Sequence, residues 1–169
     1  LIKFAANNAR PKAYLLANRT TLLAFNCGKF NSNPTPTANI TKEAATLLKD
    51  KAKIVEEFDR AIKVNGADTF CLVTATRGLV KDDSDYERII DIAKELKSRN
   101  HEIKLCASMG MTDKVTAKGL KEAGIDIYNS NLQTAPSTYG KRVATTHTSE
   151  DRLSTLRAAK EAGLEICTG

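Results

Sequence analysis

Three cysteines stand at equivalent places in three apolar runs that are typical of β-strands. They are Cys71 in TFCLVTATRG, Cys106 in IKLCASMG and Cys167 in LEICTG. If the three strands are parallel neighbours, thiols that lie far apart in the sequence can meet on one interior. Thiolates are ligands that iron and zinc favour in proteins, so the pattern indicates metal or sulfur chemistry. The alternative is that these cysteines are simply buried, because cysteine often packs inside proteins without a chemical role.

The residue before each thiol is apolar, which gives the three runs a common register. These residues are Phe70, Leu105 and Ile166. Successive side chains of a strand point to opposite faces of the sheet. We therefore expect the three apolar residues to face a layer of helices and the three thiols to face one shared interior, close to one another.

Helical and strand-like segments alternate along the chain. Apolar periodicity and glycine or proline breaks define the elements. The predicted strands cover 21–27, 68–74, 102–107, 125–130 and 164–168, and the predicted helices cover 41–65, 84–99, 112–123 and 148–162. Ser84 is the expected N-cap of the second helix, and Thr148 or Ser149 that of the last. The stretch between 131 and 147 is expected to be a long loop.

The phrases VNGAD, KEAGID and KEAGLE mark the same event three times, in which a helix ends, a glycine turns the chain and a strand begins. Strict alternation predicts an α/β fold with parallel strands joined by right-handed crossovers. A complete (β/α) barrel needs roughly 250 residues, so 169 residues predict a partial TIM-type barrel of about five strands and four helices. We expect one domain over 1–169, with the repeats in 51–169, and a homodimer that covers the open strand edges.

Composition narrows the class of protein. The net charge is +6, but basic residues are interspersed with acidic ones along the helices, and aromatic residues make up only 5%. This pattern is typical of solvated helix faces and does not favour nucleic-acid binding. No apolar run approaches the roughly 20 residues that a membrane-spanning helix requires, and we see no signal peptide. Four cysteines without a CxxC pair fit a reducing cytoplasm.

The segment from 54 to 169 resembles biotin synthase, a family of radical S-adenosylmethionine enzymes. That family carries a YNxNLDTxPxxYG block and a TxxxRLxTLxxxxxAGxxxCxGG block. Here the blocks read YNSNLQTAPSTYG and TSEDRLSTLRAAKEAGLEICTG, at matching spacing. The resemblance implies a sulfurtransferase that inserts sulfur into dethiobiotin to form biotin.

In the family, three cysteines and an arginine hold a 2Fe-2S cluster that is thought to donate the sulfur. The resemblance carries the three thiolate positions to Cys71, Cys106 and Cys167, while the arginine belongs to a later strand that this sequence does not reach. For these three cysteines, the match therefore favours a metal site over simple burial.

The same blocks contain the family's contacts to S-adenosylmethionine and substrate. The resemblance carries them to Asn129, Asn131 and Arg152, the last near the carboxylate of the cofactor. The family's aspartate that accepts from a ribose hydroxyl is Gln133 here. A neutral amide can still accept from a hydroxyl, but without the strength of a charged acceptor.

The family also places a CxxxCxxC motif after its first strand, and its three thiolates hold a 4Fe-4S cluster that binds S-adenosylmethionine. The matching stretch here is GKFNSNPTPT, which puts Phe30, Pro34 and Thr37 at the three positions. None of these side chains is a usual iron–sulfur ligand. As written, the chain is therefore not expected to be a competent biotin synthase. Either the cluster is genuinely lost, or the residue identities there are unreliable or engineered.

Three functions follow from these observations. The first is a biotin synthase-type radical S-adenosylmethionine protein, or a large part of one. The second is a non-catalytic half-barrel scaffold or engineered fragment, because the radical cluster and half of the barrel are missing. The third is a basic binding module, which only the net charge supports.

Overall fold

The computed structural model describes residues 12–17, 25–27, 51–74, 77–81 and 83–169, the first two ranges by their backbone alone. The predicted start of the first helix at Thr41 lies outside the described residues. So do Phe30, Pro34 and Thr37, the positions where the resemblance expects the radical-cluster cysteines.

The strands form one sheet in the order β2-β1-β3-β4-β5-β6. The strands are β1 (Lys12–Ala17), β2 (Phe25–Cys27), β3 (Thr69–Thr74), β4 (Lys104–Ser108), β5 (Ile127–Asn129) and β6 (Glu165–Cys167). All neighbouring strands pair in parallel except β1 and β2, which are antiparallel. The sheet of parallel strands joined by helices confirms the predicted α/β class, and the arrangement is that of a partial barrel.

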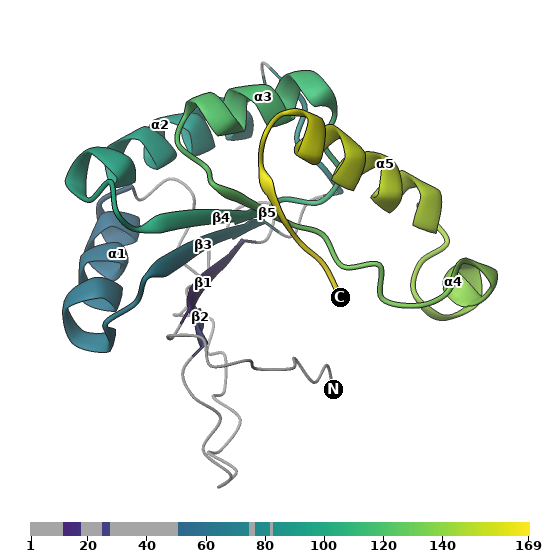
Figure 1. Ribbon diagram of the computed structural model, residues 1–169, viewed down its shortest axis with the longest axis horizontal. Coiled ribbons are helices and arrows are strands. Elements are labelled where there is room, and N and C mark those ends of the chain that lie inside the picture. The colour runs from purple at the N-terminus through teal and green to yellow at the C-terminus, as the bar shows by residue number, and fades with distance from the viewer. Residues whose placement is uncertain (1–11, 18–24, 28–50, 75–76, 82) are drawn as a thin grey trace, which may run out of the picture.

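Five helices are described: α1 (Lys51–Asn65), α2 (Ser84–Arg99), α3 (Lys114–Glu122), α4 (Pro136–Arg142) and α5 (Ser149–Glu161). Figure 1 shows α1, α2, α3 and α5 arching around one side of the curved sheet, while the C-terminus lies on the other side. Helices on the outer side and a concave inner side are the layers of a (β/α) barrel.

Two predicted elements were wrong. Of the expected first parallel strand at 21–27, the structure describes residues 25–27, which run antiparallel at the sheet edge. Residues 12–17 pair in parallel with β3 instead. The expected loop 131–147 contains α4, which begins with Pro136 at its first position. Proline fits the first turn of a helix, where its missing N–H has no partner to lose.

Side chains cap the N-termini of α2 and α5. Asp83, not the expected Ser84, caps α2 by accepting from the backbone N–H of Asp85. The expectation for α5 is confirmed, because Thr148 forms a reciprocal capping box with Asp151. An aspartate one residue before a serine can compete for the same cap, since both are strong N-cap residues.

The sheet separates two apolar clusters. The larger lies between the sheet and the helices and includes Phe70, Leu72, Leu105 and Tyr128. The smaller lies on the opposite face and contains the cysteines. Burial on both faces explains why the central strands read as continuous apolar runs rather than as alternating ones.

Two of the three acidic residues that end the recurring helix–glycine–strand phrases, Asp126 and Glu165, form ion pairs at the amino ends of the strands. The Asp126 carboxylate lies 2.7 Å from Lys97 Nζ and accepts the Leu105 backbone N–H at 2.8 Å. The Glu165 carboxylate lies 2.7 Å from Lys104 Nζ, in a more exposed pair. These contacts tie neighbouring repeats together at the end of the barrel that is usually structural.

We expect Asp126→Ala to lower the free energy of unfolding by about 1–3 kcal/mol, because it leaves the Leu105 N–H without its acceptor and removes the ion pair of the half-buried Lys97. Glu165→Ala is the matched control, and its exposed pair should cost less than about 1 kcal/mol. Urea unfolding of the three chains measures both values. Equal losses in the two variants would contradict the structural role given to Asp126.

Asp113 caps α3, and its carboxylate accepts the Thr116 backbone N–H at 2.7 Å. This hydrogen bond lowers the pKa of Asp113 below its usual value of 3.8. A lowered folded-state pKa stabilises the protein above the unfolded value, and the stabilisation is lost as the pH falls through the folded value. We expect the stability advantage of the parent over Asp113→Ala, about 1 kcal/mol at pH 7, to shrink below pH 3.8. An advantage that stays constant down to pH 2 would exclude the charged cap.

Candidate functional site

The three cysteines face the same side of the sheet. Cys71 lies directly opposite Cys106 on the neighbouring strand, and both are buried, with 0% and 5% of their surface exposed. Cys167 is half-buried and packs against the cluster that these two form with Ile127. This confirms the expected common register for the thiols.

The apolar residues before the thiols take the opposite face, as expected. Phe70 and Leu105 belong to the core between sheet and helices, and Ile166 packs against that core. The alternation of one residue therefore directs the three thiols to the concave side, away from the helices.

The three thiols are staggered along the strands. Within the described ranges, no group of three His, Cys, Asp or Glu side chains is placed to hold one ion. The register explains this, because Cys106 pairs with Ile127, whereas Cys167 lies farther along and pairs with Asn129. A 2Fe-2S cluster takes four ligands across its two irons and so does not need three around one ion. Cluster binding by these residues stays a prediction.

The carboxyl end of β5 carries two asparagines whose amide oxygens are buried. Asn129 ends the strand and Asn131 follows two residues later. Among the residues that the structure describes, neither Oδ1 atom has a hydrogen-bond partner. Buried polar atoms are nearly always paired, so these two acceptors suit donors from a ligand. Hydroxyl and amino groups are donors of that kind.

The segment after Asn131 is fixed by hydrogen bonds to the last strand. The backbone N–H groups of Leu132 and Gln133 donate to Gly169 O at 2.9 and 3.2 Å, and Ser130 N–H donates to Cys167 O at 3.1 Å. Gln133 has a φ of 68°, a left-handed conformation that costs free energy in a residue other than glycine. Its side chain is exposed. The predicted cofactor residues and Cys167 are thus joined through the backbone.

Arg152 lies beside this segment. Its Nη1 donates to Asn131 O at 2.9 Å, and its Nε donates to the Tyr139 hydroxyl. Tyr139 is 2% exposed, and its hydroxyl lies 2.9 Å from His147 Nε2. Neither Tyr139 nor His147 was expected from the sequence to belong to the site. The signal for Tyr139 was its place inside the YNSNLQTAPSTYG block, whereas His147 carried none.

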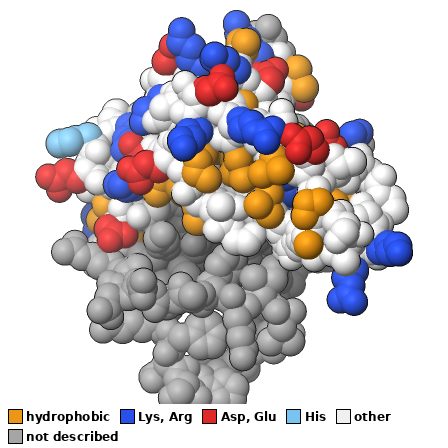
Figure 2. All heavy atoms as spheres, turned by 45° about the vertical axis from the view of Figure 1, so that its right-hand side comes forward, with side chains coloured by type: hydrophobic (Ala, Val, Ile, Leu, Met, Phe, Trp, Pro, Cys, Tyr) orange, Lys and Arg blue, Asp and Glu red, His pale blue; other side chains and the backbone are white. Residues whose placement is uncertain are grey.

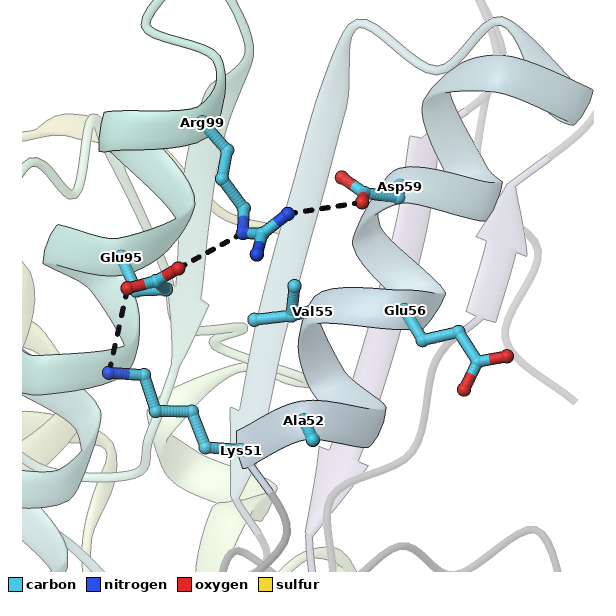
Figure 3. Close-up of a pocket in the computed structure, with 7 residues that line it drawn as sticks. All are labelled: Lys51, Ala52, Val55, Glu56, Asp59, Glu95 and Arg99. Carbon is cyan, nitrogen blue, oxygen red and sulfur yellow. Dashed lines mark hydrogen bonds and ion pairs between the residues drawn. The ribbon is translucent and has the colours of Figure 1, made fainter.

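A groove between α1 and α2 lies in the helix layer (Figure 3). It is lined by Lys51, Ala52, Val55, Glu56, Asp59, Glu95 and Arg99. Four of its charged groups already pair, since Arg99 contacts Asp59 at 3.2 Å and Glu95 at 3.0 Å, and Lys51 contacts Glu95 at 3.7 Å. These pairs join two helices, and the groove is on the side of the sheet opposite the thiols. We do not assign it a chemical role.

The surface shows no separate basic face in the view of Figure 2, where Lys and Arg alternate with Asp and Glu over the described part. The mixture does not favour the third function, a basic binding module. None of the helices in the described part combines the length and the apolar character needed to cross a membrane.

The Radical SAM superfamily is the family whose sequence model matches the chain, over residues 34–169. Among curated proteins, the chain is 46% identical over 110 residues to the biotin synthase of Desulforudis audaxviator, a match that covers 65% of this chain and 32% of that protein. It is 34% identical over 166 residues to the biotin synthase of an Azoarcus species, which covers 98% of this chain and 48% of that protein. The chain therefore spans about a third to a half of the length of these relatives.

Solved structures support the fold. Methylornithine synthase (PylB) has a TM-score of 0.56 at 17% identity, covering 94% of this chain and 44% of that one. The FeFe-hydrogenase maturase HydG from Carboxydothermus hydrogenoformans has a TM-score of 0.56 at 19% identity, covering 74% of this chain and 28% of that one. At such identities the likeness concerns the fold alone.

We expect Asn131→Leu to raise the free energy of unfolding of the ligand-free chain by about 1 kcal/mol, because it removes a buried acceptor without a partner and keeps the shape of the side chain. Asn100→Leu is the matched control. Asn100 Oδ1 accepts the Glu102 backbone N–H at 3.0 Å, so this change should destabilise the chain. Urea unfolding measures both, and destabilisation by Asn131→Leu would show that its amide is already paired.

Proposed function

Because the chain belongs to the Radical SAM superfamily, we propose that it is part of a biotin synthase-type protein that inserts sulfur into dethiobiotin. The similarity to curated biotin synthases supports the proposal. So does the convergence of three thiols on one face of the sheet, which is the observation that carries it. We propose one partial-barrel domain over 1–169 and a cytoplasmic setting, where reducing conditions keep thiols available to iron.

In this proposal Cys71, Cys106 and Cys167 hold a 2Fe-2S cluster. The cluster would supply the sulfur that the product gains. The first two thiols come from adjacent strands in register, and the third packs at the carboxyl end of β6. The apolar surroundings of Cys71 and Cys106 limit access of water to iron–thiolate bonds.

Asn129, Asn131 and Arg152 are proposed to bind S-adenosylmethionine. The two buried amide oxygens accept hydroxyl or amino groups, and the guanidinium pairs with a carboxylate. Asn129 and Asn131 lie at the carboxyl end of β5, and Arg152, on α5, contacts the Asn131 carbonyl there. Binding sites of (β/α) barrels are found at the carboxyl ends of the strands. Cys167 pairs directly with Asn129 in the sheet, so the proposed cofactor and cluster sites share an edge.

The residues present do not fit the 4Fe-4S cluster of the family. Phe30, Pro34 and Thr37 offer no thiolate at the three matching positions. We therefore derive no radical step for this chain, and we propose that it is incomplete for catalysis as written.

A half-barrel scaffold is the second candidate. The observation in its favour is β6, which ends the described sheet with one neighbour, β5. An unpaired strand edge binds another strand readily, so we propose that a second copy covers it in a homodimer. Light scattering tests this, and a stable monomer at micromolar concentration would contradict it.

We expect anaerobic reconstitution with iron and sulfide to give about two irons per chain and the visible absorbance of a 2Fe-2S cluster. Cys71→Ser, Cys106→Ser and Cys167→Ser should each lose most of the bound iron. Cys27→Ser is the matched control and should keep it, because the proposal gives Cys27 no ligand role. Equal iron in all four variants, or none in the parent chain, would refute the cluster assignment.

A further inference from the structure

We infer that Tyr139 and His147 are positioning residues that hold Arg152 beside the Asn131 segment, ready for a ligand carboxylate. The inference rests on the proposed function in one respect, since that proposal supplies S-adenosylmethionine as the ligand. The contacts that carry it belong to the described chain and involve two residues that no motif assigned.

Arg152 is held by two different elements. Its Nη1 donates to the Asn131 carbonyl at 2.9 Å, and its Nε donates to the Tyr139 hydroxyl. An arginine has five N–H donors in a planar fork. Within the described structure, no hydrogen bond uses Nη2, so that end of the fork remains for a ligand. A guanidinium held through two of its nitrogens can bind a carboxylate through the third with little further loss of conformational freedom.

Tyr139, on α4, holds the Arg152 side chain in place. Its ring is buried, with 2% of its surface exposed, and the centre of the ring lies 6.0 Å from the guanidinium carbon of Arg152. Because the hydroxyl oxygen accepts from Arg152 Nε, its single proton is directed to His147 Nε2 at 2.9 Å. In this arrangement His147 Nε2 is the acceptor, and Nδ1 lies 3.2 Å from Thr146 Oγ1.

His147 fixes the direction of the hydroxyl proton. Without an acceptor at Nε2, the hydroxyl proton is free to rotate. The hydrogen bond from Arg152 Nε to the hydroxyl oxygen is then weakened. The imidazole also packs edge-on against the Tyr139 ring, with centroids 5.7 Å apart. The segment between α4 and α5 thus acts on Arg152 through one hydroxyl group.

A purely structural role would be the simplest alternative, since a buried hydroxyl needs a partner wherever it lies. Two observations favour a ligand. Asn131, which accepts from Arg152 through its backbone, carries one of the buried amide oxygens that have no partner in the described chain. Arg152 itself keeps its Nη2 donors without a partner in the described chain, beside the same Asn131. Buried amide oxygens without partners in the described structure, beside the Arg152 guanidinium, suit a ligand that bears donor groups and a carboxylate.

The test compares two probes by anaerobic titration calorimetry with the full chain. S-adenosylmethionine carries the carboxylate, whereas 5′-methylthioadenosine shares the adenosine and the sulfur but lacks it. The variants are Tyr139→Phe, which removes the hydroxyl, His147→Leu, which removes the acceptor, and His147→Gln, whose amide oxygen can replace Nε2 as an acceptor.

We expect Tyr139→Phe and His147→Leu to weaken S-adenosylmethionine binding roughly 5–10-fold, the effect of losing one positioning hydrogen bond. His147→Gln should restore affinity to within about 2-fold, and 5′-methylthioadenosine should bind all four chains alike. Equal weakening of both probes would assign the pair a structural role only. Unchanged binding of S-adenosylmethionine would overturn the inference outright.

A measurement without ligand separates this inference from the proposed function. In ¹⁵N NMR spectra, Arg152 Nε–H should exchange slowly in the parent and in His147→Gln, and faster in Tyr139→Phe and His147→Leu. If the parent chain binds neither probe, the cofactor assignment under the proposed function fails, while the exchange rates still decide whether the pair holds Arg152. Identical rates in all four chains would contradict the inference.

Discussion

The pairing of β3 with β4 sets Cys71 opposite Cys106, and the rest of the proposed site depends on that register. Side chains alternate along each strand, so one choice of face for the thiols sends Phe70 and Leu105 into the core beneath the helices. A shift of one residue would reverse both faces, placing thiols under the helices and large apolar groups on the concave side. The free energy of burying the helix-side core therefore also holds the thiols in place.

Among the described residues, the polar groups at the amino ends of the strands are paired, whereas some of those at the carboxyl ends are not. At the amino ends, Asp126 and Glu165 pair with lysines and tie one repeat to the next. At the carboxyl ends, Asn129 and Asn131 keep buried acceptors without partners in the described chain. Satisfied polar groups stabilise a fold, whereas unsatisfied ones cost free energy and are retained where a ligand can pair with them. Because the paired groups and the unpaired acceptors lie at opposite ends of the strands, the free-energy cost of the unpaired acceptors is confined to the proposed site.

Much of the scaffold could be predicted from periodicity. The predicted bounds of the second helix, 84–99, match α2, and the glycines of the recurring phrases mark the helix ends. The register of the thiols followed from the apolar residue before each one. The strand at 12–17 could not be predicted, because six residues of mixed character give no periodic signal and the strand forms through pairing with β3. Tyr139 and His147 were missed because their contact depends on how α4 approaches α5, which sequence spacing does not specify.

The most direct test of this account is anomalous diffraction at the iron edge from crystals of the anaerobically reconstituted chain. The account predicts iron at one place only, as a 2Fe-2S cluster on the concave face of the sheet in contact with Cys71, Cys106 and Cys167. It predicts no iron at residues 30–37. Iron bound at 30–37, or bound away from the three thiols, would contradict it. So would a structure in which any of the three thiols faces the helices.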